Sequence, residues 1–85
     1  MYISKAKREA IANAVLSNRV NTREAVTATD FETKLKHDTA ADMAKFAIDI
    51  MLGLDNDGHA KSMLESYTIM GEEAAIRWTH VIERV

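Results

Sequence analysis

The sequence predicts an all-α fold, a small bundle of four to five helices joined by short loops. Three observations predict it. The chain of 85 residues contains no proline, so no residue of that kind interrupts a long helix. Apolar residues recur every three or four positions over most of the chain, and isolated glycines stand where such segments end. We expect residues 1–85 to form a single helical domain.

The segment of residues 39–54, TAADMAKFAIDIMLGL, is the most apolar in the chain and predicts a central hydrophobic helix over about 40–54. On a projection of about 100° per residue, its charged side chains form one narrow stripe: Asp42, Lys45 and Asp49. The remaining apolar arc is about twice as wide as the ~100° arc of an ordinary surface helix. Such a helix needs cover on two sides, either from its own chain or from a second copy. Thr39 is its expected N-cap and Gly53 its expected stop.

A C-terminal helical hairpin is predicted from the next two periodic segments, over residues 60–70 and 73–84. The first segment has a regular amphipathic pattern, and Gly71 suits the C-terminal cap of a helix. In the second, Glu73 and Arg77 stand four residues apart with the acid first, which is the favourable order for an ion pair on a helix.

The N-terminal part of the chain is predicted to be helical but interrupted. Residues 4 to about 18 form a helical pattern, with Ser4 as its N-cap. Asparagines and β-branched residues then disturb the pattern, and we expect a break at residues 18–22. A short helical turn and a restart should follow, with a further helix over about 30–37. The four residues 29–32, T-D-F-E, have the spacing of a capping box.

The composition excludes several classes of protein. Without cysteine the chain has neither disulfides nor thiolate chemistry, which suits a reducing cytoplasm. No apolar run reaches the ~18 residues of a membrane-spanning helix, and no signal-peptide pattern opens the chain. We therefore expect a cytoplasmic protein. Because the polar sides of the two amphipathic segments near the C-terminus are neutral or acidic, we also expect that it does not bind membranes. Because the chain starts with methionine, we expect a complete small reading frame of a kind frequent in phages and mobile elements.

Catalytic and metal-binding patterns are weak. No serine lies in a G-x-S-x-G elbow, and there is no glycine-rich phosphate loop. Asp55, Asp57 and His59 alternate in one loop. As an EF-hand, this loop would have Gly53 and Leu64 at its first and last ligand positions, where neither side chain can bind calcium. We predict a turn and capping role for the loop, no cofactor, no metal and no enzyme activity; a metal-dependent or carboxylate enzyme ranks third among the hypotheses.

Charge is unevenly distributed along the chain, whose net charge is −2. Residues 1–23 hold five basic residues and one acid, whereas residues 24–85 hold six basic and twelve acidic residues. The basic residues of the first part are Lys5, Lys7, Arg8, Arg19 and Arg23. The first three project in different directions around a helix, and the other two fall in or next to the expected break. A nucleic-acid-associated regulator, or another acidic partner bound through these residues, is the second hypothesis.

Protein binding is the leading hypothesis. The wide apolar arc, an alanine-rich core and five methionines favour a small regulator, inhibitor or assembly factor that binds a protein of unknown identity through helical surfaces. Because an alanine-rich core buries little area, we also expect a homodimer or a higher oligomer. The candidate contact residues are Met43, Phe46, Ile50 and Trp78. The alternative for each of them is a place in the central core.

Overall fold

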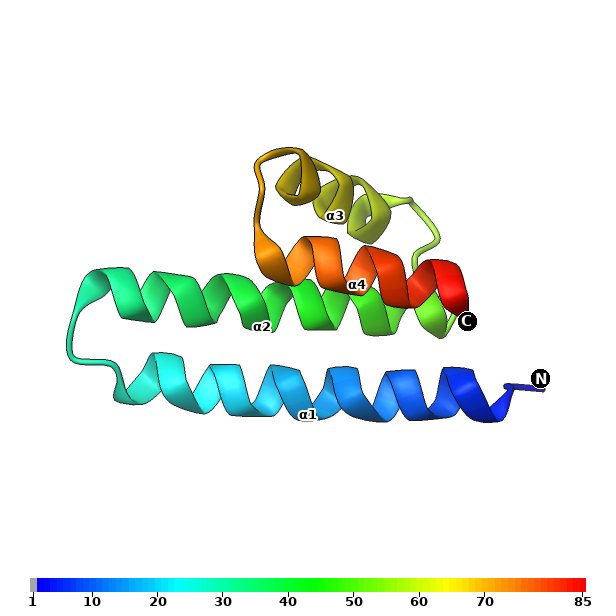
Figure 1. Cartoon of the computed structure of the whole chain (residues 1–85), viewed down its shortest axis with the longest axis horizontal. Helices are drawn as coiled ribbons and strands as arrows, with labels where there is room; N and C mark the ends of the chain where they lie inside the picture. Colours follow the sequence, from blue (N-terminus) through cyan, green and yellow to red (C-terminus); the bar gives the residue numbers. More distant parts are fainter. Residues whose placement is uncertain (1) are drawn as a thin grey trace.

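The computed structural model describes residues 2–85 and contains four α-helices. They are α1 (Lys5–Thr27), α2 (Phe31–Met51), α3 (His59–Ile69) and α4 (Glu73–Arg84). No strand occurs in this part of the chain. α1 and α2 form a long antiparallel hairpin, and the shorter α3 and α4 lie against one half of it (Figure 1). The prediction of an all-α fold with four to five helices is confirmed.

The predicted break at residues 18–22 is wrong, because α1 runs through this segment without interruption. The asparagines that suggested a break make hydrogen bonds that a helix can accommodate. Asn18 Nδ2 donates to the backbone oxygen of Ala41 on α2 at 2.9 Å. Asn21 Nδ2 donates to a backbone oxygen one turn earlier in α1, also at 2.9 Å. Packing of α1 along α2 therefore outweighs the weak helix propensity of this segment.

The two helices expected over 30–37 and 40–54 form one helix, α2, so a separate central helix is not confirmed. Asp30, one residue after the expected capping position, is the N-cap of α2. Its carboxylate accepts a hydrogen bond from the Thr33 backbone N–H at 2.9 Å. Thr39, the expected N-cap of the central helix, lies inside α2. The polar residues before the apolar stretch thus extend the helix instead of starting a new one.

Gly53 and Gly71 follow the ends of α2 and α3, as predicted. Their φ angles are +73° and +84°, in the left-handed region that residues with a Cβ rarely adopt. After each glycine, the next backbone N–H donates to the carbonyl oxygen five residues earlier, at 2.8 Å and 2.9 Å respectively. These bonds satisfy carbonyl groups that the helix ends would otherwise leave open, and they turn the chain toward the next helix.

The core is rich in alanine. The buried cluster that joins the helices has small members on α1, α2 and α4 and larger members on α2, α3 and α4: Ala10, Ala14, Ala44, Ala47, Met43, Met51, Leu64, Ala75 and Trp78. Small side chains allow α1 to approach α2 closely. α2 contacts all three other helices, whereas α1 packs mainly on α2. The wide apolar arc of α2 is therefore covered within one chain.

The N-cap of α2 gives a prediction about pH. The hydrogen bond from the Thr33 backbone N–H favours the ionised Asp30 carboxyl and lowers its pKa from the ordinary value of 3.8. A carboxyl whose pKa is lowered by folding stabilises the protein above that ordinary value, and the contribution is lost as the pH falls through the folded-state pKa. Asparagine is an equally good cap but has no charge, so Asp30→Asn lacks this contribution at every pH.

We expect the wild type to have a larger free energy of unfolding than Asp30→Asn at neutral pH, and the difference to shrink as the pH falls below 3.8. Urea unfolding followed by circular dichroism, from neutral pH down to about pH 3, measures this difference. Glu65→Gln, which removes an exposed carboxylate on α3, is the control at neutral pH and should change the free energy of unfolding by no more than about 0.5 kcal/mol. A difference between wild type and Asp30→Asn that persists unchanged in acid would contradict the prediction.

Candidate functional site

The four predicted contact residues lie together in the core and do not form an exposed surface. Met43 is 1% exposed and Trp78 is 4% exposed. Phe46 and Ile50 are half-buried and pack against the same cluster. Phe46 also meets the ring of His59 edge-on, with the ring centroids 5.6 Å apart. These side chains hold the helices together, and Trp78 in addition borders a groove at the surface.

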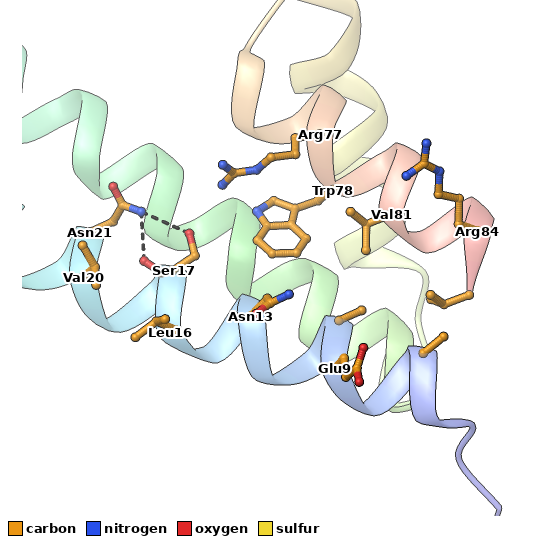
Figure 2. Close-up of a pocket in the computed structure, with 13 residues that line it drawn as sticks. Glu9, Asn13, Leu16, Ser17, Val20, Asn21, Arg77, Trp78, Val81 and Arg84 are labelled. Atoms are coloured by element: carbon orange, nitrogen blue, oxygen red, sulfur yellow. Dashed lines mark hydrogen bonds between the residues drawn. The ribbon is translucent and has the colours of Figure 1, made fainter.

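An open groove of about 660 Å³ runs between α1 and α4 (Figure 2). It exists because both helices pack on α2 but barely touch each other. One face of α1 forms the first wall, and one face of α4 forms the second. The principal lining residues are Glu9, Asn13, Leu16, Ser17, Val20 and Asn21 on α1, and Arg77, Trp78, Val81 and Arg84 on α4. Leu16 and Val20 are 61% and 49% exposed, so the α1 wall presents apolar surface to solvent.

The indole of Trp78 points from α4 into the space between the two walls (Figure 2). Its Nε1–H is buried and has no hydrogen-bond partner among residues 2–85. A buried donor without an acceptor costs about 1–3 kcal/mol, and native proteins rarely contain one. In Figure 2 the indole nitrogen lies on the side of the ring toward Arg77. The groove therefore holds a donor that an incoming acceptor would satisfy.

Arg77 lies beside this donor. The carbon of its guanidinium is 5.1 Å from the centroid of the Trp78 ring, which is a cation–π arrangement. The ion pair predicted between Arg77 and Glu73 is absent: within the described residues, the ion pair that forms joins Lys34 and Asp38, at 3.8 Å. The groove thus presents a cation without a carboxylate next to an N–H without an acceptor.

Hydrogen bonds within α1 and between α1 and α2 fix the α1 wall. Asn21 Nδ2 donates to the backbone oxygen and to the hydroxyl of Ser17, at 2.9 Å and 3.2 Å. Asn21 Oδ1 is then an acceptor, so His37 Nδ1, 2.9 Å away on α2, carries the hydrogen and donates to it. His37 therefore joins two helices, a role that its place on a polar face of the sequence pattern did not indicate.

The basic N-terminal residues are aligned more closely than the sequence analysis predicted. Because α1 is continuous, four of them project within about 60° of one another on a helical wheel: Lys5, Arg8, Arg19 and Arg23. All four are exposed, and at the usual rise they span about 27 Å along α1. Lys7 projects toward the α2 side and is half-buried. We refer to the four aligned residues as the basic stripe.

The loop between α2 and α3 caps the start of α3. The Asp55 carboxylate accepts from the backbone N–H groups of Ala60 and Lys61, at 2.8 Å and 3.1 Å. The Asp57 carboxylate accepts from the backbone N–H of His59 at 3.1 Å. These bonds confirm the predicted capping role of the loop. Among residues 2–85, no three His, Asp or Glu side chains are grouped so that they could hold a metal ion.

Sequence reasoning missed the exposed apolar pair Leu16 and Val20. The signal was present: on one uninterrupted helix, Glu9, Asn13, Leu16 and Val20 fall on a single face. The break expected at residues 18–22 assigned Val20 to a loop and removed it from that face. A continuous helix over the whole segment would have shown an apolar patch that the buried alanines of α1 do not use.

No protein-family model, curated protein or solved structure matches this chain. In the part of the chain that the structure describes, no helix has the combination of length and apolar character that crossing a membrane requires. The evidence for function is therefore the groove between α1 and α4 and the basic stripe on α1.

Proposed function

We propose that this protein is a small non-catalytic module that binds another protein and acts as a regulator, inhibitor or assembly factor. The groove between α1 and α4 carries the proposal, because exposed Leu16 and Val20 lie in it beside the buried Trp78 ring. Concave apolar surface with a few polar groups is typical of binding sites, and exposed apolar patches on small domains often mark contacts with partners.

In this proposal α2 supports the site. Its apolar part, the stretch over about 40–54 that was expected as a central hydrophobic helix, packs between the other helices. Met43, Phe46 and Ile50 then act by holding α1 and α4 at a fixed separation, and the partner touches the groove walls. Rigid walls favour binding because less conformational freedom is lost on association.

A matched pair of variants tests the groove. Val20→Glu places a charge in the groove, and Val26→Glu makes the same change at a residue of α1 that is exposed elsewhere. Tagged wild type and both variants serve as baits in the native cell, and captured proteins are identified by mass spectrometry. We expect one partner to be retained by wild type and Val26→Glu and lost with Val20→Glu. Equal capture by all three baits would refute the groove as the binding site.

Self-association remains a prediction from the sequence. The wide apolar arc that suggested a second copy is covered by α1, α3 and α4, so a second copy would have to use exposed surface such as the groove. Light scattering of the wild type and of Val20→Glu measures this. A dimer that dissociates in Val20→Glu would support association through the groove, whereas a monomer at all concentrations would remove self-association from the proposal.

The basic stripe favours a second candidate function, binding of nucleic acid. Four exposed cations in line on α1, two toward each end of the helix, can contact phosphates along one nucleic acid, and the affinity of such contacts falls steeply with salt. We expect salt-dependent retention on DNA or RNA to be lost in Arg8→Glu with Arg19→Glu. The control is Arg77→Glu with Arg84→Glu, which makes the same change of charge on α4. Loss of retention in both double variants would indicate an effect of net charge and not of the stripe.

A further inference from the structure

The polar groups at one end of the groove specify the chemistry of an occupant. Trp78 is 4% exposed, and its Nε1–H lacks an acceptor among residues 2–85. The guanidinium of Arg77 lies beside the same ring, 5.1 Å from its centroid. Both groups only donate hydrogen bonds, and one of them is a cation. A carboxylate is the protein group that satisfies both, because its two oxygens accept and its charge is opposite to that of Arg77.

The rest of the groove offers apolar contacts that suit an occupant in the form of a helix. Leu16 and Val20 on α1 and Val81 on α4 all line the groove. The α1 wall extends from Ala6 to Asn21, which corresponds to about 22 Å, or four turns of helix. Amphipathic helices bind such grooves through apolar residues three and four positions apart.

We propose that the groove binds an acidic amphipathic helix of a partner protein, with one aspartate or glutamate accepting from Trp78 Nε1 and pairing with Arg77. The proposal rests on the proposed protein-binding function and adds the chemistry of the partner. Arg77 is exposed, so its guanidinium can shift to meet the carboxylate. Glu9, the acid that lines the groove, stands on α1 a full three turns before Asn21, and Glu72 and Glu73 line the neighbouring hollow with Arg77 without forming an ion pair with it.

Trp78 makes the test direct, because it is the single tryptophan of the chain. A displayed library of amphipathic helical peptides is selected against the wild-type protein. The best peptide is then synthesised in its acidic form and with each acid replaced by the corresponding amide. Binding to the ¹⁵N-labelled full chain is followed through the one indole N–H signal, and affinity through Trp78 fluorescence.

We expect the selected peptides to share an acidic residue, and the indole proton signal to move downfield when the acidic peptide binds. The amide peptide should bind about tenfold or more weakly to the wild type, as expected when a charge-assisted hydrogen bond is lost. Arg77→Met, which keeps the apolar stem and removes the charge, should weaken the acidic peptide by a similar factor. Arg19→Met on the basic stripe is the matched control and should leave the affinity unchanged.

The outcomes separate this inference from the proposed function. One outcome would overturn the carboxylate contact while supporting a protein-binding groove. In that outcome, peptides bind the wild type and do not bind Val20→Glu, but neither Arg77→Met nor the amide replacement changes their affinity. Peptides insensitive to Val20→Glu, or the absence of any selected peptide, would overturn both. If octanoate bound more tightly than any peptide, the occupant of the groove would be a small carboxylate and not a partner helix. If the wild type formed a dimer that Arg77→Met dissociates, the occupant would be a second copy of the chain.

Discussion

Replacing Trp78 with alanine is expected to lower the free energy of unfolding by about 3–5 kcal/mol. The indole is 4% exposed and belongs to the buried cluster that joins α4 to the other helices. Its removal leaves a large cavity, although the loss of an unsatisfied N–H offsets part of the cost and favours the lower half of this range. A domain of 85 residues has a total stability of only about 4–13 kcal/mol, so the variant should be close to unfolding.

Urea unfolding followed by far-ultraviolet circular dichroism measures the effect, since the variant has no tryptophan fluorescence. His80→Ala changes an exposed residue of α4 and should shift the stability by no more than about 0.5 kcal/mol. If Trp78→Ala unfolded at the same urea concentration as His80→Ala, the packing described for α4 would be incorrect.

Replacing Met43 with alanine is expected to lower the free energy of unfolding by about 2–5 kcal/mol. Met43 is the largest of the completely buried side chains in the described part of the chain, with 1% of its surface exposed. It lies on α2, in the cluster that also contains residues of α1, α3 and α4. Alanine has a higher helix propensity than methionine, so the loss is due to the lost contacts and the cavity and not to a weaker helix.

Met70→Ala supplies a matched control, because it makes the same chemical change at a side chain that is 70% exposed. Its effect should remain within about 0.5 kcal/mol. Both variants keep Trp78, whose fluorescence reports unfolding in urea. If Met43→Ala lowered the free energy of unfolding as little as Met70→Ala does, the core would not be closed around α2.

The parts of the fold that depend on neighbouring residues could be predicted from the sequence. The helices expected over 60–70 and 73–84 correspond to α3 and α4, because each has a periodic apolar face and a glycine stop between them. Ser4 was identified as the N-cap of α1, and its hydroxyl accepts from the Lys7 backbone N–H at 3.1 Å. A cap or a stop involves residues within one or two turns, and the sequence shows those directly.

The parts of the fold that depend on contacts between distant residues could not be predicted from the sequence. Asn18 looks like a helix breaker until its side-chain partner, the backbone oxygen of Ala41, is known to lie 23 residues later. The same is true of Asn21 and His37, which are 16 residues apart and bond across the hairpin. These contacts stabilise helical segments whose local propensity is weak, and propensity alone therefore predicts two interruptions that the structure lacks.

The candidate site was the least predictable part. A groove arises where two helices pack on a third without packing on each other, and no periodic pattern in one helix shows that gap. Trp78 is a candidate contact residue in the sequence, but a buried aromatic residue and a binding-site residue have the same sequence pattern. The observation on which the proposed site rests, the unpaired Nε1–H beside Arg77, is visible only in three dimensions.

The order of the helices has a consequence for how fast the protein forms. Each helix packs on the one that follows it in the chain, and the further strong contact, between α2 and α4, skips a single short helix. Contacts between near neighbours close small loops, and helical proteins of this type fold in microseconds to milliseconds. Since the chain has no proline, isomerisation of prolyl bonds cannot add a slow step. A slow phase in refolding would therefore report the association of chains.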